Sequence, residues 1–168
     1  MIIIGVDPAF RKNGFWAAIL DTQQKTVLFK PFKNVFEFGD MVREYVGQDV
    51  FFSIENSNAD NVTFKKSDNP GIATRYSRDA GKNQAVSELA VQYVKLHHGD
   101  RLHIVTAADK KKGWKEQSRF FHAIVKSDGY TLLTPQKNQD QCDAYFIAMM
   151  GYSQLKFTNK LTRGILNG

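Results

Sequence analysis

The sequence predicts one α/β domain built on a five-stranded mixed sheet with helices on both faces. The 168 residues suffice for one sizeable core but not comfortably for two. Three strand-like segments with short connections open the chain, which indicates an antiparallel meander. Strand-like and helical segments then alternate, so we expect the later strands to join the sheet in parallel.

The strands are predicted from β-branched and apolar runs that end at turn residues. Residues 2–6 are such a run, and it ends at Asp7-Pro8 because proline removes a backbone donor. Residues 49–55 form a similar run that ends in an acid, Glu55. The predicted strands are residues 2–6, 14–20, 26–32, 49–55 and 102–105.

The helices are predicted from apolar residues spaced three and four apart. Phe38, Met41 and Val42 show this spacing. Residues 56–79 are polar and rich in turn formers, so we expect a long surface loop there. Residues 1–155 should form the domain and 156–168 a basic C-terminal tail. The predicted helices are residues 38–46, 81–96, 114–125 and 138–150.

Charge and composition narrow the classes of function. The formal net charge is +6, which favours polyanionic partners such as nucleic acid. Cys142 is the single cysteine, so an internal disulfide is excluded, as fits a reducing cytoplasm. The chain lacks an apolar run of about 18 residues, and its apolar start meets Asp7 at once, so we expect neither a membrane span nor a signal peptide.

Four acidic residues fall at places that suggest one site. Asp7 closes the first strand, Glu55 closes the fourth, and Asp140 and Asp143 lie three apart at the start of the last helix. If the first and fourth strands are neighbours, these acids gather at one end of the sheet. Carboxylates in one place repel each other, and bound cations would offset that repulsion. Oxygen ligands favour Mg²⁺ or Mn²⁺ over zinc, and two such ions would suit in-line hydrolysis of a phosphodiester.

Each acid also has a purely structural explanation. Asp7 before Pro8 can form a turn, and Glu55 can be a solvated strand end. Asp140 and Asp143 would also favour the dipole in the first turn of a helix. All four acids together, in this order and on these elements, favour the metal site.

Short blocks of the chain resemble the RuvC-type Holliday junction resolvases of the ribonuclease H-like superfamily. The resemblance runs from residue 2 to about 152, and its first and last blocks are the most specific. Ala9 and Asn13 replace residues usual in the family, and polar residues 56–58 stand where it carries an aromatic one. The chain therefore resembles a divergent branch, such as a phage type. The matching blocks are residues 3–8 with Gly14, 52–56, 81–85 and 140–144.

The resemblance implies a ribonuclease H-like fold and a homodimer that nicks four-way DNA junctions symmetrically, leaving 5′-phosphates. It also implies two Mg²⁺ ions per active site, with Mn²⁺ able to substitute, and a cytoplasmic location at the nucleoid or in a phage-infected host. Lys115 matches a basic residue near the scissile phosphate, and one of residues 110–112 matches another. By position, the family's metal-binding acids match Asp7, Glu55, Asp140 and Asp143.

Two basic clusters interleaved with aromatic residues are predicted to contact DNA through phosphates and stacked bases. Trp114, beside the second cluster, suits core packing equally well. The first cluster comprises Phe64, Lys65, Lys66, Arg75, Tyr76, Arg78 and Lys82. The second comprises Lys110, Lys111, Lys112, Lys115 and Arg119.

A homodimeric junction-resolving endonuclease is the leading hypothesis, with Val86, Leu89 and Tyr93 as candidate interface residues. Another ribonuclease H-like nuclease, acting on flaps, branched DNA or RNA–DNA hybrids, remains open. So does a non-catalytic nucleic-acid-binding module. An actin-like or sugar-kinase-like ATPase would need two such domains, for which the chain is too short.

Overall fold

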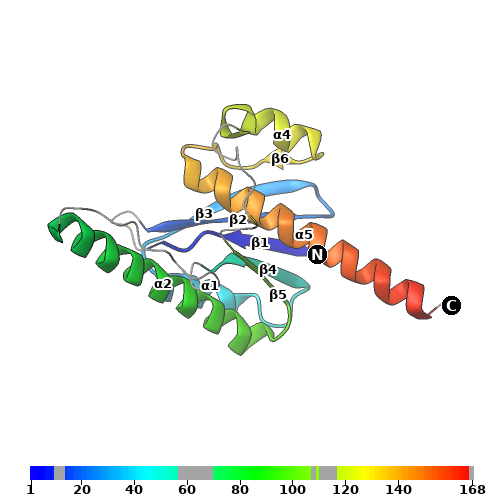
Figure 1. Ribbon diagram of the computed structural model, residues 1–168. Helices are drawn as coiled ribbons and strands as arrows, with labels where there is room; N and C mark the ends of the chain where they lie inside the picture. Colours follow the sequence, from blue (N-terminus) through cyan, green and yellow to red (C-terminus); the bar gives the residue numbers. More distant parts are fainter. Residues whose placement is uncertain (10–13, 57–69, 107–108, 110–116, 167–168) are drawn as a thin grey trace.

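A six-stranded mixed sheet with helices on both faces forms the protein (Figure 1). The computed structural model describes residues 1–9, 14–56, 70–106, 109 and 117–166, and the side chains of these except 70, 73 and 161–166. The strands lie in the order β5-β4-β1-β2-β3-β6. Their bounds are β1 Ile2–Val6, β2 Phe15–Asp21, β3 Thr26–Phe32, β4 Val50–Glu55, β5 Leu102–Val105 and β6 Thr131–Leu132.

The predicted arrangement of the first five strands is confirmed. Strands β1, β2 and β3 form an antiparallel meander, while β4 pairs in parallel with β1 and β5 in parallel with β4. The predicted number of five strands is wrong, because β6 adds to the outer edge in parallel with β3. This strand has two residues, too few for an apolar pattern, and backbone hydrogen bonds hold it, including Thr131 N–H to the Lys25 carbonyl at 2.8 Å.

The helices divide between the two faces of the sheet, as predicted (Figure 1). Helices α1 and α2 cover one face, and α5 covers the other, with α4 beside it. A single 3-10 turn, η2, leads into α4. The bounds are α1 Val35–Glu44, α2 Pro70–His98, η2 Ser118–Phe120, α4 Phe121–Ser127 and α5 Gln139–Leu166.

Two predicted boundaries differ from the structure. Residues 70–79, expected in a surface loop, form the first turns of α2, and residues 156–166, expected in a tail, continue α5. The described side chains of residues 71–79 are exposed, so this stretch lacks the apolar stripe that marks a packed helix. The helix predicted over residues 114–125 corresponds to η2 and α4 in its described part.

Strand alternation sorts the core into two layers. Ile3 packs with α5 residues on one face, whereas Ile4 and Val6 pack with α1 and α2 residues on the other. In β4, Phe51 likewise packs on the α5 side, and Phe52 on the α2 side. The odd-numbered positions of β1 and β4 therefore face α5.

Helix α5 lies very close to the sheet because small residues line the contact. A Cβ atom on Gly5 would come within 2.2 Å of the Ala144 carbonyl oxygen and 2.3 Å of the Ala148 nitrogen. One on Gly151 would lie 2.5 Å from the Ser53 Cβ. These contacts fix where α5 crosses β1 and β4.

The Cys142 thiol is fully buried on the α5 side of the sheet. Burial raises its pKa to about 11, from an ordinary value of 9.0. The folded protein thus disfavours the thiolate, whereas the unfolded chain ionises freely. The folded state is therefore fully stable with respect to this thiol below pH 9 and loses stability as the pH rises from 9 to 11. We expect ionisation of this thiol to lower the free energy of unfolding by about 2 kcal/mol between pH 9 and pH 11, measured by urea unfolding.

The matched variant for this prediction is Cys142→Ala. Burial also raises the pKa of Tyr130, to about 12, and this group acts in the same direction at higher pH. The difference in pH dependence between the wild type and Cys142→Ala therefore isolates the thiol. Parallel curves for the two proteins between pH 9 and 11 would contradict the assignment.

Candidate functional site: an acidic edge of the sheet

Asp7 and Glu55 lie at the ends of neighbouring parallel strands. Val6 of β1 pairs with Ile54 of β4, so the next residue on each strand is one of the two acids. Adjacent strands lie about 4.8 Å apart. The condition set by the sequence analysis, that these two strands be neighbours, is confirmed.

The strand pattern directs both acids to the face that α5 covers. Gly5 lies under Ala144, and Ser53 lies under Gly151. Asp7 and Glu55 follow these residues at a spacing of two, the repeat of one strand face. The side chains of both acids are half-buried, and one carboxylate oxygen of Glu55 is fully buried.

A reciprocal cap sets the first turn of α5. The Gln141 N–H donates to Asn138 Oδ1 at 3.0 Å, and the Asn138 N–H donates to Gln141 Oε1 at 3.2 Å. This is the capping-box arrangement, with Asn and Gln in the two roles. The helix therefore begins at Gln139, with Asp140 in its first turn and Asp143 three residues further on.

Helix α5 runs opposite to β1 and β4 (Figure 1). Ala144 contacts Gly5, late in β1, whereas Leu155 lines a cavity with Met1 and Asp49, next to the starts of β1 and β4. The first turn of α5 consequently lies at the edge where β1 and β4 end. We call the end of the sheet at which β1 and β4 finish the acidic edge. It carries Asp7, Glu55, Asp140 and Asp143.

The four acids share this edge without forming a ready-made metal centre. All four side chains are half-buried, and Gln139 Nε2 donates to Asp143 Oδ1 at 2.8 Å. Over the described residues, no three side chains of His, Cys, Asp or Glu lie close enough together to hold a metal ion. The chemistry of the donors, four carboxylates, fits a hard divalent cation.

A polar network that the sequence analysis missed supports the acidic edge from α2. Asn56, which follows Glu55, is buried and donates through Nδ2 to Glu88 Oε2 at 3.2 Å. The Ser87 hydroxyl donates to the Pro8 carbonyl oxygen, at 3.4 Å. Helix α2 is thus tied to the residues just after β1 and β4. The signal in the sequence is a serine on the buried face of α2, four residues before Val91.

The described part of the first basic cluster lies on the exposed start of α2. Arg75, Arg78 and Lys82 are exposed, and Tyr76 is 51% exposed. The two arginine Nε atoms lie 3.8 and 3.9 Å from the Asp79 carboxylate, pairs that are weak in water. Figure 1 shows the start of α2 projecting past the sheet at the end where α5 begins.

Most of the other predicted contact residues lie outside the described residues. Arg119 is described and is exposed on η2. Those outside are Phe64, Lys65, Lys66, Lys110, Lys111, Lys112, Trp114 and Lys115.

The fold and the site together define an α/β protein with acidic residues at the carboxyl edge of a mixed sheet. Comparisons with protein-family models, with curated proteins and with solved structures find no match. In the described part of the chain, no helix is both long and apolar enough to cross a membrane.

Proposed function

We propose that the protein is a divalent-metal-dependent endonuclease that cuts branched DNA, related in fold and mechanism to the RuvC-type resolvases. The observation that carries the proposal is the shared edge. Asp7 and Glu55 follow paired residues of parallel strands, and the first two turns of α5 bring Asp140 and Asp143 to the same end. Acids from three separate stretches of the chain lie at this same end of the sheet, which helix capping or turn formation does not explain.

The four carboxylates would hold Mg²⁺ or Mn²⁺, two ions per site by the resemblance. Bound cations of this kind lower the pKa of an attacking water and stabilise the leaving oxygen of a phosphodiester. Asp7 and Glu55 would act from the rigid end of the sheet, and Asp140 and Asp143 from the first turns of α5. Gln139 orients Asp143 through its hydrogen bond. Lys115, outside the described residues, would contact the scissile phosphate.

Branched DNA as substrate is supported by the basic start of α2 at the same end of the molecule. Arg75, Arg78 and Lys82 are exposed and supply positive charge there, and the pairs of the two arginines with Asp79 are weak in water. Such side chains bind phosphates regardless of sequence. The exposed Tyr76 offers a ring on which an unpaired base can stack.

A homodimer would present two such sites to the paired strands of a junction. Among the candidate interface residues, Val86 and Tyr93 pack against the core on the α2 side, and Leu89 is 45% exposed. Leu89 is therefore the residue of this group that we propose to contact a second copy. Sedimentation of the wild type and of Leu89→Glu tests it: the wild type should be a dimer and the variant a monomer.

The charge at the start of α2 should govern the salt dependence of DNA binding. We expect Arg75→Gln, Arg78→Gln and Lys82→Gln combined to lower the slope of log affinity against log salt by roughly 2–3, at about 0.9 per lost phosphate contact. Fluorescence anisotropy of a labelled junction between low and moderate salt measures this slope.

The matched control removes the same charge elsewhere. Lys95, Lys156 and Lys160 are exposed on the later parts of α2 and α5, away from the acidic edge. Their combined replacement by Gln should leave the slope nearly unchanged. Equal effects of the two triple variants would mean that general charge, rather than this surface, binds the DNA.

The decisive experiment offers the wild-type protein three substrates with Mg²⁺: a synthetic four-way junction, a flap and an RNA–DNA hybrid. Paired, symmetric nicks in the junction with 5′-phosphate ends are the expected result. Cleavage of the hybrid alone would indicate a ribonuclease H. Binding to the junction with no metal-dependent cleavage would indicate a non-catalytic DNA-binding module and would refute the proposal.

A further inference from the structure

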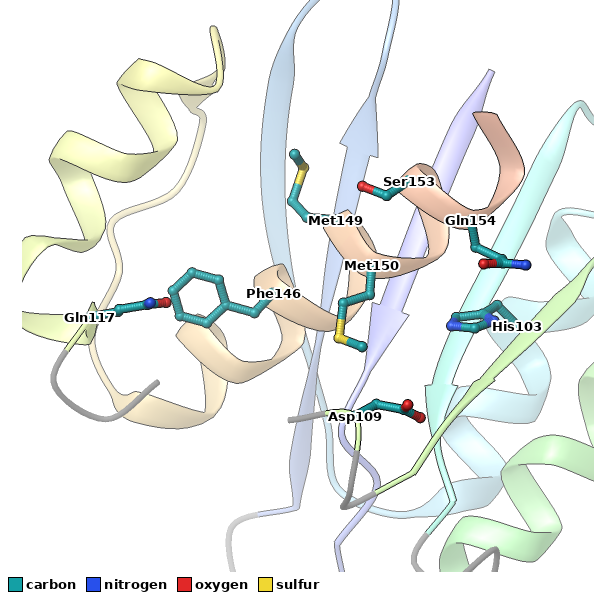
Figure 2. A pocket seen from close by; sticks show the side chains of 8 residues that line it. All are labelled: His103, Asp109, Gln117, Phe146, Met149, Met150, Ser153 and Gln154. Atoms are coloured by element: carbon teal, nitrogen blue, oxygen red, sulfur yellow. The ribbon is translucent and has the colours of Figure 1, made fainter. Parts of the chain in front are cut away.

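A pocket of about 540 Å³ lies between the edge strand β5 and helix α5, outside the acidic edge (Figure 2). Phe146, Met149 and Met150 of α5 supply its apolar wall. Its volume falls within the range of about 300–1,000 Å³ that is typical of small-molecule sites. The pocket therefore has room for a ligand about the size of a nucleoside.

The described polar lining of the pocket offers a neutral imidazole and a carboxylate as hydrogen-bonding groups. Burial lowers the pKa of His103, so its ring is neutral at pH 7. The Thr106 N–H donates to Asp109 Oδ2 at 2.7 Å and lowers the pKa of Asp109, which keeps that carboxylate ionised. Asp109 is thus the charged side chain among the described lining residues, and its carboxylate can accept a hydrogen bond from a ligand. Figure 2 shows His103, Asp109 and Met150 around one space, with Gln154 beside His103.

One stripe of α5 connects the pocket to the acidic edge. Asp143, Phe146 and Met150 follow one another at spacings of three and four, so they lie on one side of the helix. At 1.5 Å per residue, the stripe from residue 143 to 150 spans about 10 Å. A ligand in the pocket would therefore lie beside whatever the acids hold.

We propose that this pocket receives an unstacked nucleobase of the DNA strand held at the acidic edge, and that it favours bases with an exocyclic amino group. The inference rests on the proposed function, since it assumes that DNA lies at that edge. A base is flat and uncharged, so Phe146 and the two methionines can cover its faces. The Asp109 carboxylate can accept from an amino group, which adenine, cytosine and guanine carry and thymine lacks. Unstacking costs least for a base that is already unpaired.

The methionine methyl groups report directly on this pocket. The chain has four methionines, of which Met149 and Met150 line the pocket and Met41, a residue of α1, is buried on the other face of the sheet. The wild-type protein, labelled with ¹³C at its methionine methyls and kept free of metal, is titrated with short duplexes. One duplex is fully paired, one carries a single unpaired adenine, and one a single unpaired thymine.

We expect the Met149 and Met150 signals to shift with the unpaired adenine, and the Met41 signal to stay in place. The duplex with the unpaired adenine should bind about tenfold more tightly than the paired duplex, as a stacked and hydrogen-bonded base would give. Asp109→Ala, which removes the acceptor, should abolish the preference for adenine over thymine. Equal shifts with paired and unpaired duplexes, or none, would overturn the proposal.

A filled pocket is the complementary test. Ser153 is exposed at the rim, so Ser153→Trp should place a ring in the pocket without disturbing the core. This variant should lose the preference for the unpaired base, whereas Thr158→Trp, at an exposed position further along α5, should keep it. An unchanged preference in Ser153→Trp would also overturn the proposal.

The outcome is independent of hydrolysis, because the titration contains no metal. Methyl shifts as expected, in a protein that never cleaves DNA, would support the pocket and refute the nuclease. Junction cleavage by a protein whose Met149 and Met150 signals do not shift with unpaired bases would support the nuclease and refute the pocket proposal.

Discussion

Asp7→Asn should abolish Mg²⁺-dependent cleavage of a four-way junction while leaving the fold intact. Losing one of the acids that we propose to bind metal should cost several kcal/mol of transition-state stabilisation, which corresponds to a rate lower by on the order of 10³-fold. The same change removes a negative charge from the acidic edge, so the repulsion experienced by its remaining carboxylates, those of Glu55, Asp140 and Asp143, falls. In EDTA, we therefore expect the melting temperature to be equal to or above that of the wild type.

The opposite signs of these two effects make the test specific. Mg²⁺ should raise the melting temperature of the wild type and raise that of Asp7→Asn much less, because ligands stabilise the state that binds them. Asp100→Asn is the control, since Asp100 is exposed just before β5 and so lies at the opposite edge of the sheet. It should cleave at the wild-type rate. Wild-type cleavage by Asp7→Asn would remove this residue from the active site.

Gly5→Ala should destabilise the protein more than most single substitutions. The added methyl would meet backbone atoms of α5, the Ala144 oxygen and the Ala148 nitrogen, at little over 2 Å. Backbone cannot rotate away as a side chain can, so α5 must lift from β1. We expect a loss at or above the upper end of the range for overpacked cores, about 1–3 kcal/mol, measured by urea unfolding.

Gly81→Ala is the matched control for this prediction. Gly81 lies within α2, and a Cβ atom there would meet nothing within 4 Å. The substitution should stabilise the protein by about 0.5–1 kcal/mol, because alanine loses less backbone entropy in a helix than glycine. If the two variants unfold alike, the close contact between α5 and β1 is absent in solution.

Gly5→Ala also connects the fold to the site. Lifting α5 would move Asp140 and Asp143 relative to Asp7, so cleavage should fall even in protein that remains folded. Measuring cleavage and stability under conditions where the variant is folded separates the displacement of the acids from simple unfolding.

Local patterns predicted the meander, the strand ends and the surroundings of the acids. The apolar run of β1 and its proline stop sufficed to place Asp7 after a buried strand, and the spacing of Asp140 and Asp143 put them on one helix. The same reasoning missed β6 because two residues carry no periodicity. It also missed the start of α2, where no apolar stripe marks the helix because the described side chains of residues 71–79 are exposed.

The pocket shows a second limit. His103 lies in a strand of four residues, and the sequence carries no sign that Asp109 and Met150 lie across a cavity from it. Residues so far apart along the chain become neighbours through the packing of α5 on β5, which no local spacing reports.

From its sequence alone, this protein is an α/β domain in which acidic residues end two strands and begin a helix, because periodicity and turn chemistry are local properties of the chain. That these acids share an edge follows from the parallel register of β1 with β4 and from the direction of α5. Both depend on contacts between distant segments, above all the close approach of α5 at Gly5, and such contacts exist only once the chain has folded.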